Sequence, residues 1–210
     1  MLRVSLTGPG NIDHHFSKLL NIPTNKFEKH VNEIAKVLAD SGNEIIFLLD
    51  RGVAFEIAKK YKEFNGRKVF GAVPKQDKDF GIKHLQPYIT IVDEIIDTDN
   101  WYKQDMINAI LGDVVLMLGN SLGSLREITA GFYLYKLFQG EKPKVDVTNK
   151  RIHKDAVAVD NIPFTLLIYK PFFKKKLNYE IEVYIKKSKG QIFYIKNARH
   201  LKKILELLSA

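Results

Sequence analysis

Short apolar runs alternate with amphipathic helical patterns over the first 148 residues, and this alternation constrains the fold more than any other feature. Runs of strand length cover 2–7, 44–49, 68–73, 94–97, 114–118 and 142–147, and helical patterns cover about 25–41, 53–64, 101–111 and 124–138. Strands that alternate with helices form parallel sheets covered by helices on both faces, with right-handed crossovers. We therefore expect an α/β protein.

Capping residues support several of these helices. Asn25 and Glu28 have the spacing of a capping box, and Gly42 lies where a glycine ends a helix. Asn100 is placed to cap the helix over 101–111. Between the turn at 7–11 and about Pro23 we expect a loop.

The pattern changes after about residue 150. Apolar runs over 156–160, 164–169, 179–185 and 191–195 follow one another without helical patterns between them, and Lys189-Gly190 suits a hairpin turn. A last helix over 197–209 has Asn197 at its cap. The sequence predicts a core over 1–148, and a basic, antiparallel β-rich extension with a final helix over 149–210 that packs on the core.

The positive charge belongs almost entirely to this extension. Residues 151–210 hold 13 Lys and Arg against 5 Asp and Glu, a balance of +8, which leaves +1 for residues 1–150. Lysines interleave with aromatic residues over 172–179, and more lysines follow over 186–190. These segments either contact a nucleic acid or another anionic surface, or form the solvated face of a hairpin whose aromatic residues pack inward. The alternation over 179–185 favours the second interpretation.

Several classes of protein are excluded or disfavoured. The chain has no cysteine, so it has no disulfide, thiolate metal site or cysteine nucleophile. His14 and His15 have no further ligand at metal-binding spacing, and no P-loop or Gly-x-Ser-x-Gly motif occurs. No apolar run approaches 18 residues and no secretory signal pattern opens the chain, so we expect a cytoplasmic protein without membrane contact. Abundant Lys, Glu and Ile suggest a thermophilic source.

Four segments follow predicted strands, at the carboxyl ends where ligands bind to a parallel sheet. They are TGPGN (7–11), DRG (50–52), AVPKQD (72–77) and GNSLGS (119–124), and three of them are turns that contain glycine. In the third turn, Gly119 and Gly123 allow a phosphate to approach the backbone at a helix N-terminus, and Ser121 and Ser124 offer hydroxyls. The alternative is a capping box between Ser124 and Glu127. The first turn either lines a ligand or simply ends its strand, and Arg51 either holds a phosphate or pairs with Asp50.

Residues 119–127 resemble the motif Pro-Gly-Gly-x-Gly-Thr-x-x-Glu that follows an apolar strand in the lonely-guy nucleotide phosphoribohydrolases and their relatives, the molybdenum-cofactor carrier proteins. These proteins were often labelled lysine decarboxylase-like. Gly123 and Glu127 match the motif, Ser124 replaces its Thr, and Asn108 matches an Asn of the carrier-like members. Upstream, the likeness rests on Gly52, Glu56, Gly66, Gly71 and Pro74, and the resemblance covers about residues 1–148.

The resemblance implies a Rossmann-like fold, a homo-oligomer (dimer or tetramer) and a phosphate-bearing small molecule as partner, namely a nucleotide or a molybdopterin-type cofactor. The ligand-binding residues that it implies, together with the three turns, are Gly8, Gly10, Asn11, Arg51, Gly52, Asn108, Gly119, Asn120, Ser121, Gly123 and Ser124.

Glu127 occupies the position at which the hydrolases carry a catalytic carboxylate. Those enzymes pair it with an Arg on the preceding helix, and Ile107 stands at the corresponding position here. We therefore expect a binding protein with carrier or sensor character. The alternatives are a nucleoside 5′-monophosphate phosphoribohydrolase with Glu127 as the catalytic group, and a nucleic-acid-associated protein that acts through the basic tail.

Overall fold

The computed structural model describes residues 1–78, 83–137, 144–146, 151–153 and 163–209. The strands are β1 (Arg3–Thr7), β2 (Glu44–Leu48), β3 (Val69–Val73), β4 (Glu94–Asp97), β5 (Val114–Met117), β6 (Lys144–Asp146), β7 (Arg151–His153), β8 (Thr165–Tyr169) and β9 (Gln191–Ile195). The α-helices are α1 (Thr24–Asp40), α2 (Val53–Glu63), α3 (His84–Ile89), α4 (Trp101–Leu111), α5 (Leu122–Leu137), α6 (Tyr179–Lys187) and α7 (Ala198–Ser209). A π-helical segment η1 (Asp13–Leu19) and a 3-10 turn η3 (Lys170–Phe172) complete the described elements.

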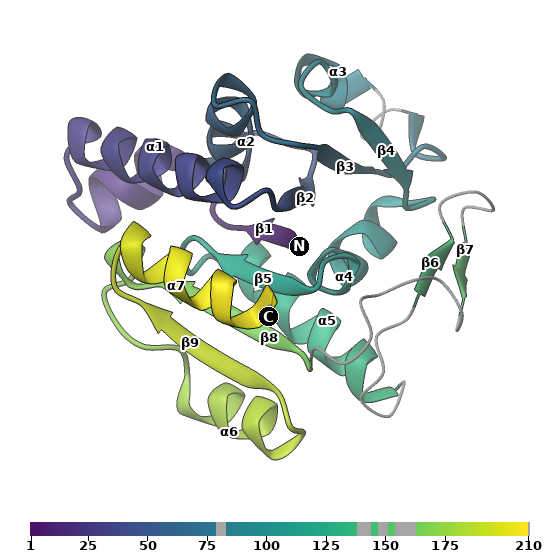
Figure 1. Cartoon of the computed structure of the whole chain (residues 1–210). Coiled ribbons are helices and arrows are strands. Elements are labelled where there is room, and N and C mark those ends of the chain that lie inside the picture. Colours follow the sequence, from purple (N-terminus) through teal and green to yellow (C-terminus); the bar gives the residue numbers. More distant parts are fainter. Residues whose placement is uncertain (79–82, 138–143, 147–150, 154–162, 210) are drawn as a thin grey trace.

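Seven of the described strands form one parallel sheet in the order β4-β3-β2-β1-β5-β8-β9. Buried apolar side chains on one face of the sheet pack with α1, α2 and α7. The other face is covered by α4, α5 and α6. The predicted α/β, Rossmann-like sheet with helices on both faces is therefore confirmed (Figure 1).

The order in which the chain adds strands to the sheet changes direction at the central strand β1. From β1 the chain builds outward through β2, β3 and β4, and then returns by α4 to place β5 on the other side of β1. The helices that follow β1 and β4 lie on opposite faces, so a crevice opens at the carboxyl ends of β1 and β5. The fold thus places a ligand-sized space at a defined position.

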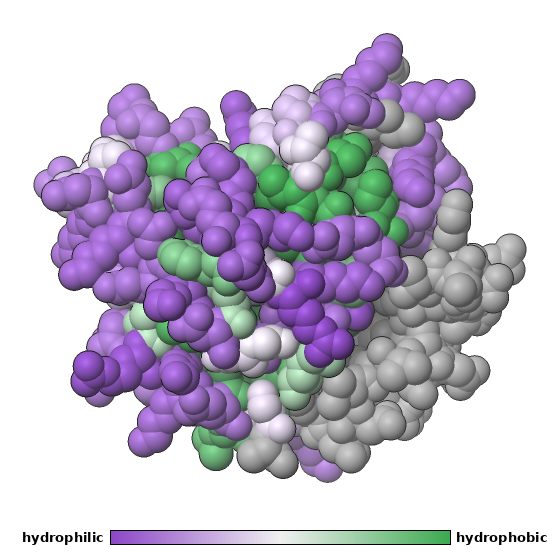
Figure 2. All heavy atoms as spheres, turned by 45° about the horizontal axis from the view of Figure 1, so that its top comes forward, coloured by the Kyte–Doolittle hydropathy of each residue, from purple (hydrophilic) through white to green (hydrophobic). Residues whose placement is uncertain are grey.

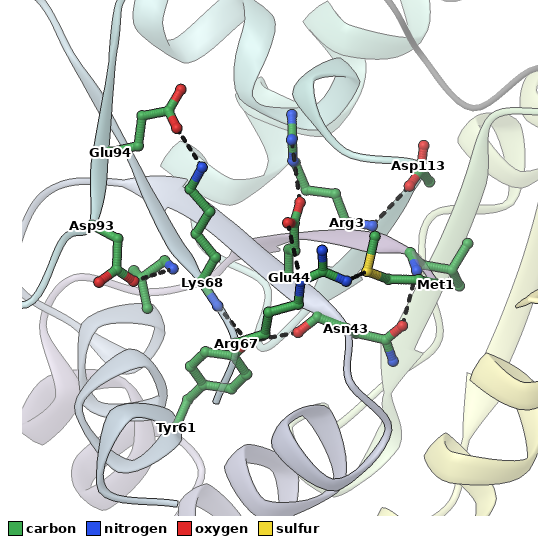
Figure 3. A network of polar contacts seen from close by, with 12 residues as sticks. Met1, Arg3, Asn43, Glu44, Tyr61, Arg67, Lys68, Asp93, Glu94 and Asp113 are labelled. Atoms are coloured by element: carbon green, nitrogen blue, oxygen red, sulfur yellow. Dashed lines mark hydrogen bonds and ion pairs between the residues drawn. The ribbon is translucent and has the colours of Figure 1, made fainter. Parts of the chain in front are cut away.

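At the amino ends of the strands, opposite this crevice, polar side chains pair with one another. Figure 3 shows Arg3 with Glu44, and Lys68 with Glu94, at 3.2 and 2.5 Å between charged atoms. The hydroxyl of Tyr61 donates to the backbone oxygen of Asn43 at 2.6 Å. This network ties the amino ends of β1 to β4 together, and it leaves the carboxyl edge as the place to look for chemistry.

Most of the predicted elements of the first 148 residues are confirmed within two residues at their ends. Gly42 has φ +64° after the last turn of α1, which is the left-handed conformation that a glycine cap adopts. Asn100 accepts a hydrogen bond from the backbone nitrogen of Lys103 at 3.0 Å, as expected of a helix cap. Asn197 likewise accepts from the nitrogen of His200 at 2.9 Å.

The predicted antiparallel extension is wrong. The strand expected over 179–185 is helix α6, in which Asn178 caps the first turn by accepting from the backbone nitrogens of Glu180 and Ile181. Acidic residues in its first turn and lysines in its last suit the helix dipole. Apolar residues at 181 and 185 are spaced equally well for one helix face and for alternation in a strand, which misled the period-two interpretation. With α6 as the crossover, β8 and β9 are parallel and extend the main sheet.

The expected hairpin at Lys189-Gly190 is a helix ending instead. Lys189 has φ +62°, and the backbone nitrogen of Gly190 donates to the oxygen of Ile185 at 2.9 Å. The strand expected over 156–160 and the boundary near residue 148 lie outside the described residues.

Three further expectations from the first part of the chain need correction. Residues 13–19 form η1 rather than loop, because Phe16 is buried in the main core. Helix α1 begins at Thr24 without a side-chain cap, so the Asn25–Glu28 capping box is absent. The strand expected over 142–147 is β6, which pairs antiparallel with β7 in a separate two-stranded sheet.

The described part of the face seen in Figure 2 is mostly hydrophilic, with apolar side chains in limited areas. Within the described ranges, none of the helices has both the length and the apolar character needed to cross a membrane.

Candidate functional site

A pocket of about 160 Å³ opens at the carboxyl ends of β1 and β2, beside the N-terminal half of α4. It adjoins the position between β1 and β5 where the strand order reverses, which is the usual ligand position in sheets of this type. Five of the residues proposed from the sequence line it, namely Gly8, Gly10, Arg51, Gly52 and Glu127.

The structure places the other proposed residues nearby but not in this wall. Asn108 lies behind Glu127 and is fully buried. Gly119 packs against the first turn, since a side chain there would come within 2.8 Å of Pro9. The remaining ones, Asn11, Asn120, Ser121, Gly123 and Ser124, also lie outside the pocket lining.

Sequence reasoning missed a group of lining residues on α4. These are Trp101, Gln104 and Asp105, and the other unpredicted lining residues are Leu6, Thr7, Leu48, Asp50, Val53 and Ala54. Gln104 precedes Asn108 by four positions and therefore shares its helix face. A second polar residue on the buried face of an apolar helix was the signal that could have identified it.

Glu127 is buried at the pocket wall and has a strongly altered acidity. Its Oε2 accepts a hydrogen bond from Nδ2 of Asn108 at 2.6 Å. Burial raises the pKa of Glu127 to about 8, against the lowering effects of the Asn108 amide and of the nearby Thr7 hydroxyl. The neighbouring carboxylate of Asp105 raises it further. At neutral pH this side chain is therefore mainly an uncharged carboxylic acid that can donate a proton or a hydrogen bond.

The predicted capping box between Ser124 and Glu127 is wrong. The cap lies one turn earlier: Ser121 Oγ accepts from the backbone nitrogen of Ser124 at 3.1 Å, and Ser124 Oγ accepts from the nitrogen of Ser121 at 2.9 Å. Because two serines complete this reciprocal pair, Glu127 is not needed at the helix end. Its side chain turns instead to Asn108 and the pocket.

Close backbone packing holds the first two turns together. Gly52 has φ +126°, and a side chain there would meet the backbone oxygen of Pro9 at 2.6 Å. The nitrogen of Val53 donates to that same oxygen at 3.2 Å. A side chain at Gly8 would meet Val53 at 2.5 Å. Glycine is therefore required at 8 and 52 by the fold itself, whatever the ligand.

Gly123 differs from these glycines. It lies in the first turn of α5, and the nearest atom to an added Cβ is Ser121 Oγ at 3.8 Å, so the space is open. No packing contact in the described structure explains a glycine there, although alanine would favour the helix.

The two aspartates that line the pocket each have a side-chain partner. Asp50 lies 3.1 Å from Nε2 of His84, and Asp105 lies 3.2 Å from the guanidinium of Arg126. Arg51 is exposed and its side chain forms no ion pair with any residue in the described ranges. The alternative pairing of Arg51 with Asp50 involves only its backbone nitrogen, which donates to Oδ1 of Asp50 at 2.6 Å. Within the described residues, the lining therefore contains an exposed, unpaired cation, Arg51, and a buried acid that is mainly neutral, Glu127.

Some buried polar atoms at the pocket have no hydrogen-bond partner in the described structure. They include Oε1 of Gln104 in the lining and Oδ1 of Asn108 behind it, whereas the Thr7 hydroxyl interacts with the Glu127 carboxyl. Such atoms also occur outside this pocket, on Arg3, His15, Ser41, Asn43 and Thr98. An unpaired buried polar group costs about 1–3 kcal/mol, so its retention calls for an explanation.

Neither metal ligation nor base stacking gains support from the rest of the described chain. No cluster of three metal-ligating side chains occurs within the described ranges. Lys174, Lys175 and Lys176 are exposed, whereas Phe172 beside them is buried and packs on Phe16 with ring centroids 4.7 Å apart. Phe172 therefore faces the core, whereas Tyr179 of the same segment is exposed.

Ile107 stands at the position that corresponds to the catalytic arginine of the hydrolases. Ile107 is buried among apolar residues between α4 and the sheet, including Ile46 and Phe70. Lys103, the basic residue of this helix, pairs with Asp99. Neither position supplies a cation to Glu127.

No protein-family model matches the chain, and no curated protein matches it. Several solved structures do match the chain over nearly its whole length. The molybdenum cofactor binding protein of the phototrophic bacterium Rippkaea orientalis is 16% identical, with a TM-score of 0.58 over 99% of this chain and 97% of that one. The molybdenum cofactor carrier protein of Chlamydomonas reinhardtii is 18% identical, with a TM-score of 0.59 over 98% and 96%. The protein TM1055 is 15% identical, with a TM-score of 0.61 over 99% of both chains. The resemblance drawn from the sequence is thereby confirmed at the level of the fold, which this chain shares with molybdenum cofactor carrier proteins over nearly its whole length.

Proposed function

We propose that this protein binds a phosphate-bearing small molecule, a nucleotide or a molybdopterin-type cofactor, at the carboxyl ends of β1 and β2, and acts as a carrier or sensor. The observation that carries the proposal is the pocket beside the strand reversal, which has the unpaired amide oxygen of Gln104 in its wall and lines its exposed side with Arg51, a cation without an ion pair in the described ranges. Similar folds that bind or carry the molybdenum cofactor agree with it.

The chemistry of the wall suits an anion. The guanidinium of Arg51 offers paired donors to a phosphate. The first turn of α5 lies outside the lining but offers further donors, because the backbone nitrogens of Leu122 and Gly123 have no partner in the described structure. The open space at Gly123 would let a ligand reach them. Glu127 in its neutral form adds no repulsion to a bound anion.

A direct binding measurement tests the proposal. We expect calorimetric titration with adenosine 5′-monophosphate (AMP) or guanosine 5′-monophosphate (GMP) to show binding that weakens about tenfold or more in Arg51→Ala, because a charge-assisted contact is lost. Arg67→Ala is the matched control, since Arg67 is an exposed arginine at the opposite edge of the sheet. No binding of any phosphate-bearing probe at millimolar concentration would refute the proposal.

The second candidate function is hydrolysis of the N-glycosidic bond of a nucleoside 5′-monophosphate. A buried carboxylic acid with its pKa raised to about 8 is suited to protonating a leaving base. Release of free adenine from AMP, abolished in Glu127→Gln, supports this function. Absence of release under conditions in which AMP binds leaves the carrier or sensor role.

Self-association belongs to the same proposal. Leu122, Tyr133 and Leu137 are exposed on α5, and their spacing puts them on one side of the helix. We expect light scattering to give the mass of a dimer or tetramer, and Tyr133→Lys to lower that mass. A monomer at all concentrations contradicts this part.

A further inference from the structure

The inner wall of the pocket is short of hydrogen-bond donors. Oε1 of Gln104 has no partner in the described structure, although the residue is only 1% exposed. A structural role does not account for a buried amide oxygen left unpaired, because an apolar residue of similar shape would avoid the cost. A bound group that carries N–H donors would satisfy it.

An aromatic residue lies on the same side of the same helix. Trp101 lines the pocket three positions before Gln104 on α4, so the two side chains leave neighbouring turns of one helix face. The indole offers a planar apolar surface, and such surfaces favour planar ring systems. A flat wall beside an unpaired acceptor is the arrangement that an amino-bearing heterocycle fits.

The lining residues suited to an anion come from other elements than Trp101 and Gln104 do. Arg51, Gly10 and Gly52 lie in the turns after β1 and β2, whereas Trp101 and Gln104 come from α4. Glu127 reaches the wall from α5, and its hydrogen bond from Asn108 fixes its position. The lining therefore combines a cationic side chain with an aromatic and an amide side chain, and one ligand that carries both a phosphate and a ring could contact both kinds of group.

We propose that Trp101 and Gln104 form a subsite for a planar heterocycle with N–H donors, in the same pocket as the residues suited to an anion, with the amide oxygen of Gln104 accepting from the ring or its amino group. This inference rests on the proposed binding of a phosphate-bearing ligand. It makes Gln104 a residue that determines specificity, and it separates purine- or pterin-type ligands from simple sugar phosphates.

The chain contains one tryptophan, so its intrinsic fluorescence reports on this wall. The test compares AMP, GMP, purine riboside 5′-monophosphate and ribose 5-phosphate, by calorimetry and by Trp101 fluorescence. We expect AMP or GMP to bind about tenfold or more tightly than ribose 5-phosphate and to change the fluorescence. Purine riboside 5′-monophosphate, which lacks the amino group, binds more weakly than the better of the two.

Gln104→Met replaces the amide by an apolar chain of similar length. We expect it to remove most of the advantage of the amino-bearing nucleotide and to change ribose 5-phosphate binding less than about twofold. The wild-type ligand series decides the question independently of whether this variant folds.

The outcomes separate the two proposals. Equal affinity for ribose 5-phosphate, AMP and GMP overturns the heterocycle subsite and leaves phosphate binding intact. A heterocycle preference that survives in folded Gln104→Met overturns the assignment to Gln104. If none of the four probes binds, both the subsite and the proposed function fail.

Discussion

The amide nitrogen of Asn108 lies 2.6 Å from Oε2 of Glu127, in the buried layer between α4, α5 and the end of β1. Asn108 also donates to the backbone oxygen of Leu6 at 3.2 Å, so a single amide joins the acid to the central strand. These two hydrogen bonds of Asn108 hold the Glu127 side chain in the pocket wall, away from the N-terminal end of α5.

The first prediction concerns the dependence of stability on pH. The pKa of Glu127 is about 8 in the folded protein against 4.5 ordinarily, so the folded state binds the proton more tightly. The contribution of Glu127 to the free energy of unfolding therefore falls as pH rises from about 4.5 to about 8, by several kcal/mol in total. Glu127→Gln removes this fall, and we expect the variant to gain stability relative to the wild type as pH rises across that window.

Urea unfolding of both proteins at a series of pH values measures the difference. The comparison is needed because burial lowers the pKa of His15 and His30, which makes stability rise with pH near the ordinary histidine value. Parallel curves for the two proteins would contradict the buried-acid description.

The second prediction uses two buried hydroxyls on the same face of β1. Ser5 Oγ donates to the backbone oxygen of Asn108 at 2.7 Å, whereas Thr7 Oγ1 makes no hydrogen bond of standard geometry and has only a minor interaction with the Glu127 carboxyl. Ser5→Ala should lower the free energy of unfolding by about 1–3 kcal/mol, because it leaves a buried oxygen unpaired. Thr7→Val should be neutral or stabilising in the absence of ligand. Equal losses in the two variants would show that Thr7 has a structural partner after all.

The third prediction contrasts two glycines. Gly52→Ala forces a side chain into a left-handed backbone and against Pro9, and we expect a loss of about 2 kcal/mol or more of stability. Gly123→Ala adds a methyl group to open space in the first turn of α5, and we expect a gain of up to about 1 kcal/mol. Thermal unfolding compares them.

If Gly123 is retained for a ligand, the same Gly123→Ala protein should be more stable yet bind AMP or GMP less tightly. Unchanged binding in a stabilised variant would remove the first turn of α5 from the site.

The fourth prediction tests the corrected end of the chain. Asn178→Ala should cost about 1 kcal/mol, because the side chain accepts hydrogen bonds from the backbone nitrogens of Glu180 and Ile181 in the first turn of α6. Exposed Lys175 nearby gives the control, and Lys175→Ala should change stability by less than about 0.5 kcal/mol. Chemical denaturation followed by circular dichroism decides between a capped helix and the strand first expected there.

The parts of the fold that follow from local patterns were predictable, and those set by other segments were not. Strands β2, β3 and β5 were evident because they are buried on both faces and are therefore almost entirely apolar. Helix α6 was missed because Ile181 and Ile185 fit both periods, and only its docking against β9 selects the helix. The π-helical segment at 13–19 depends on Phe16 reaching Phe172, a contact that no local pattern shows.

The candidate site divides in the same way. Turns after strands pointed to Gly8, Gly10, Arg51 and Gly52, because the ends of parallel strands meet at one edge. Gln104 was missed because its importance lies in a missing partner, and a sequence does not show which hydrogen bonds are left unmade.

Phosphate-bearing ligand binding at the ends of β1 and β2 is tested most directly by amide NMR during titration with AMP and GMP. We predict shifts concentrated on the backbone signals of Gly8, Gly10 and Gly52 and on the indole signal of Trp101, with those of Asn43 and Lys68 at the opposite edge unchanged. Shifts confined to other surfaces, or no shifts at millimolar ligand, would contradict the account.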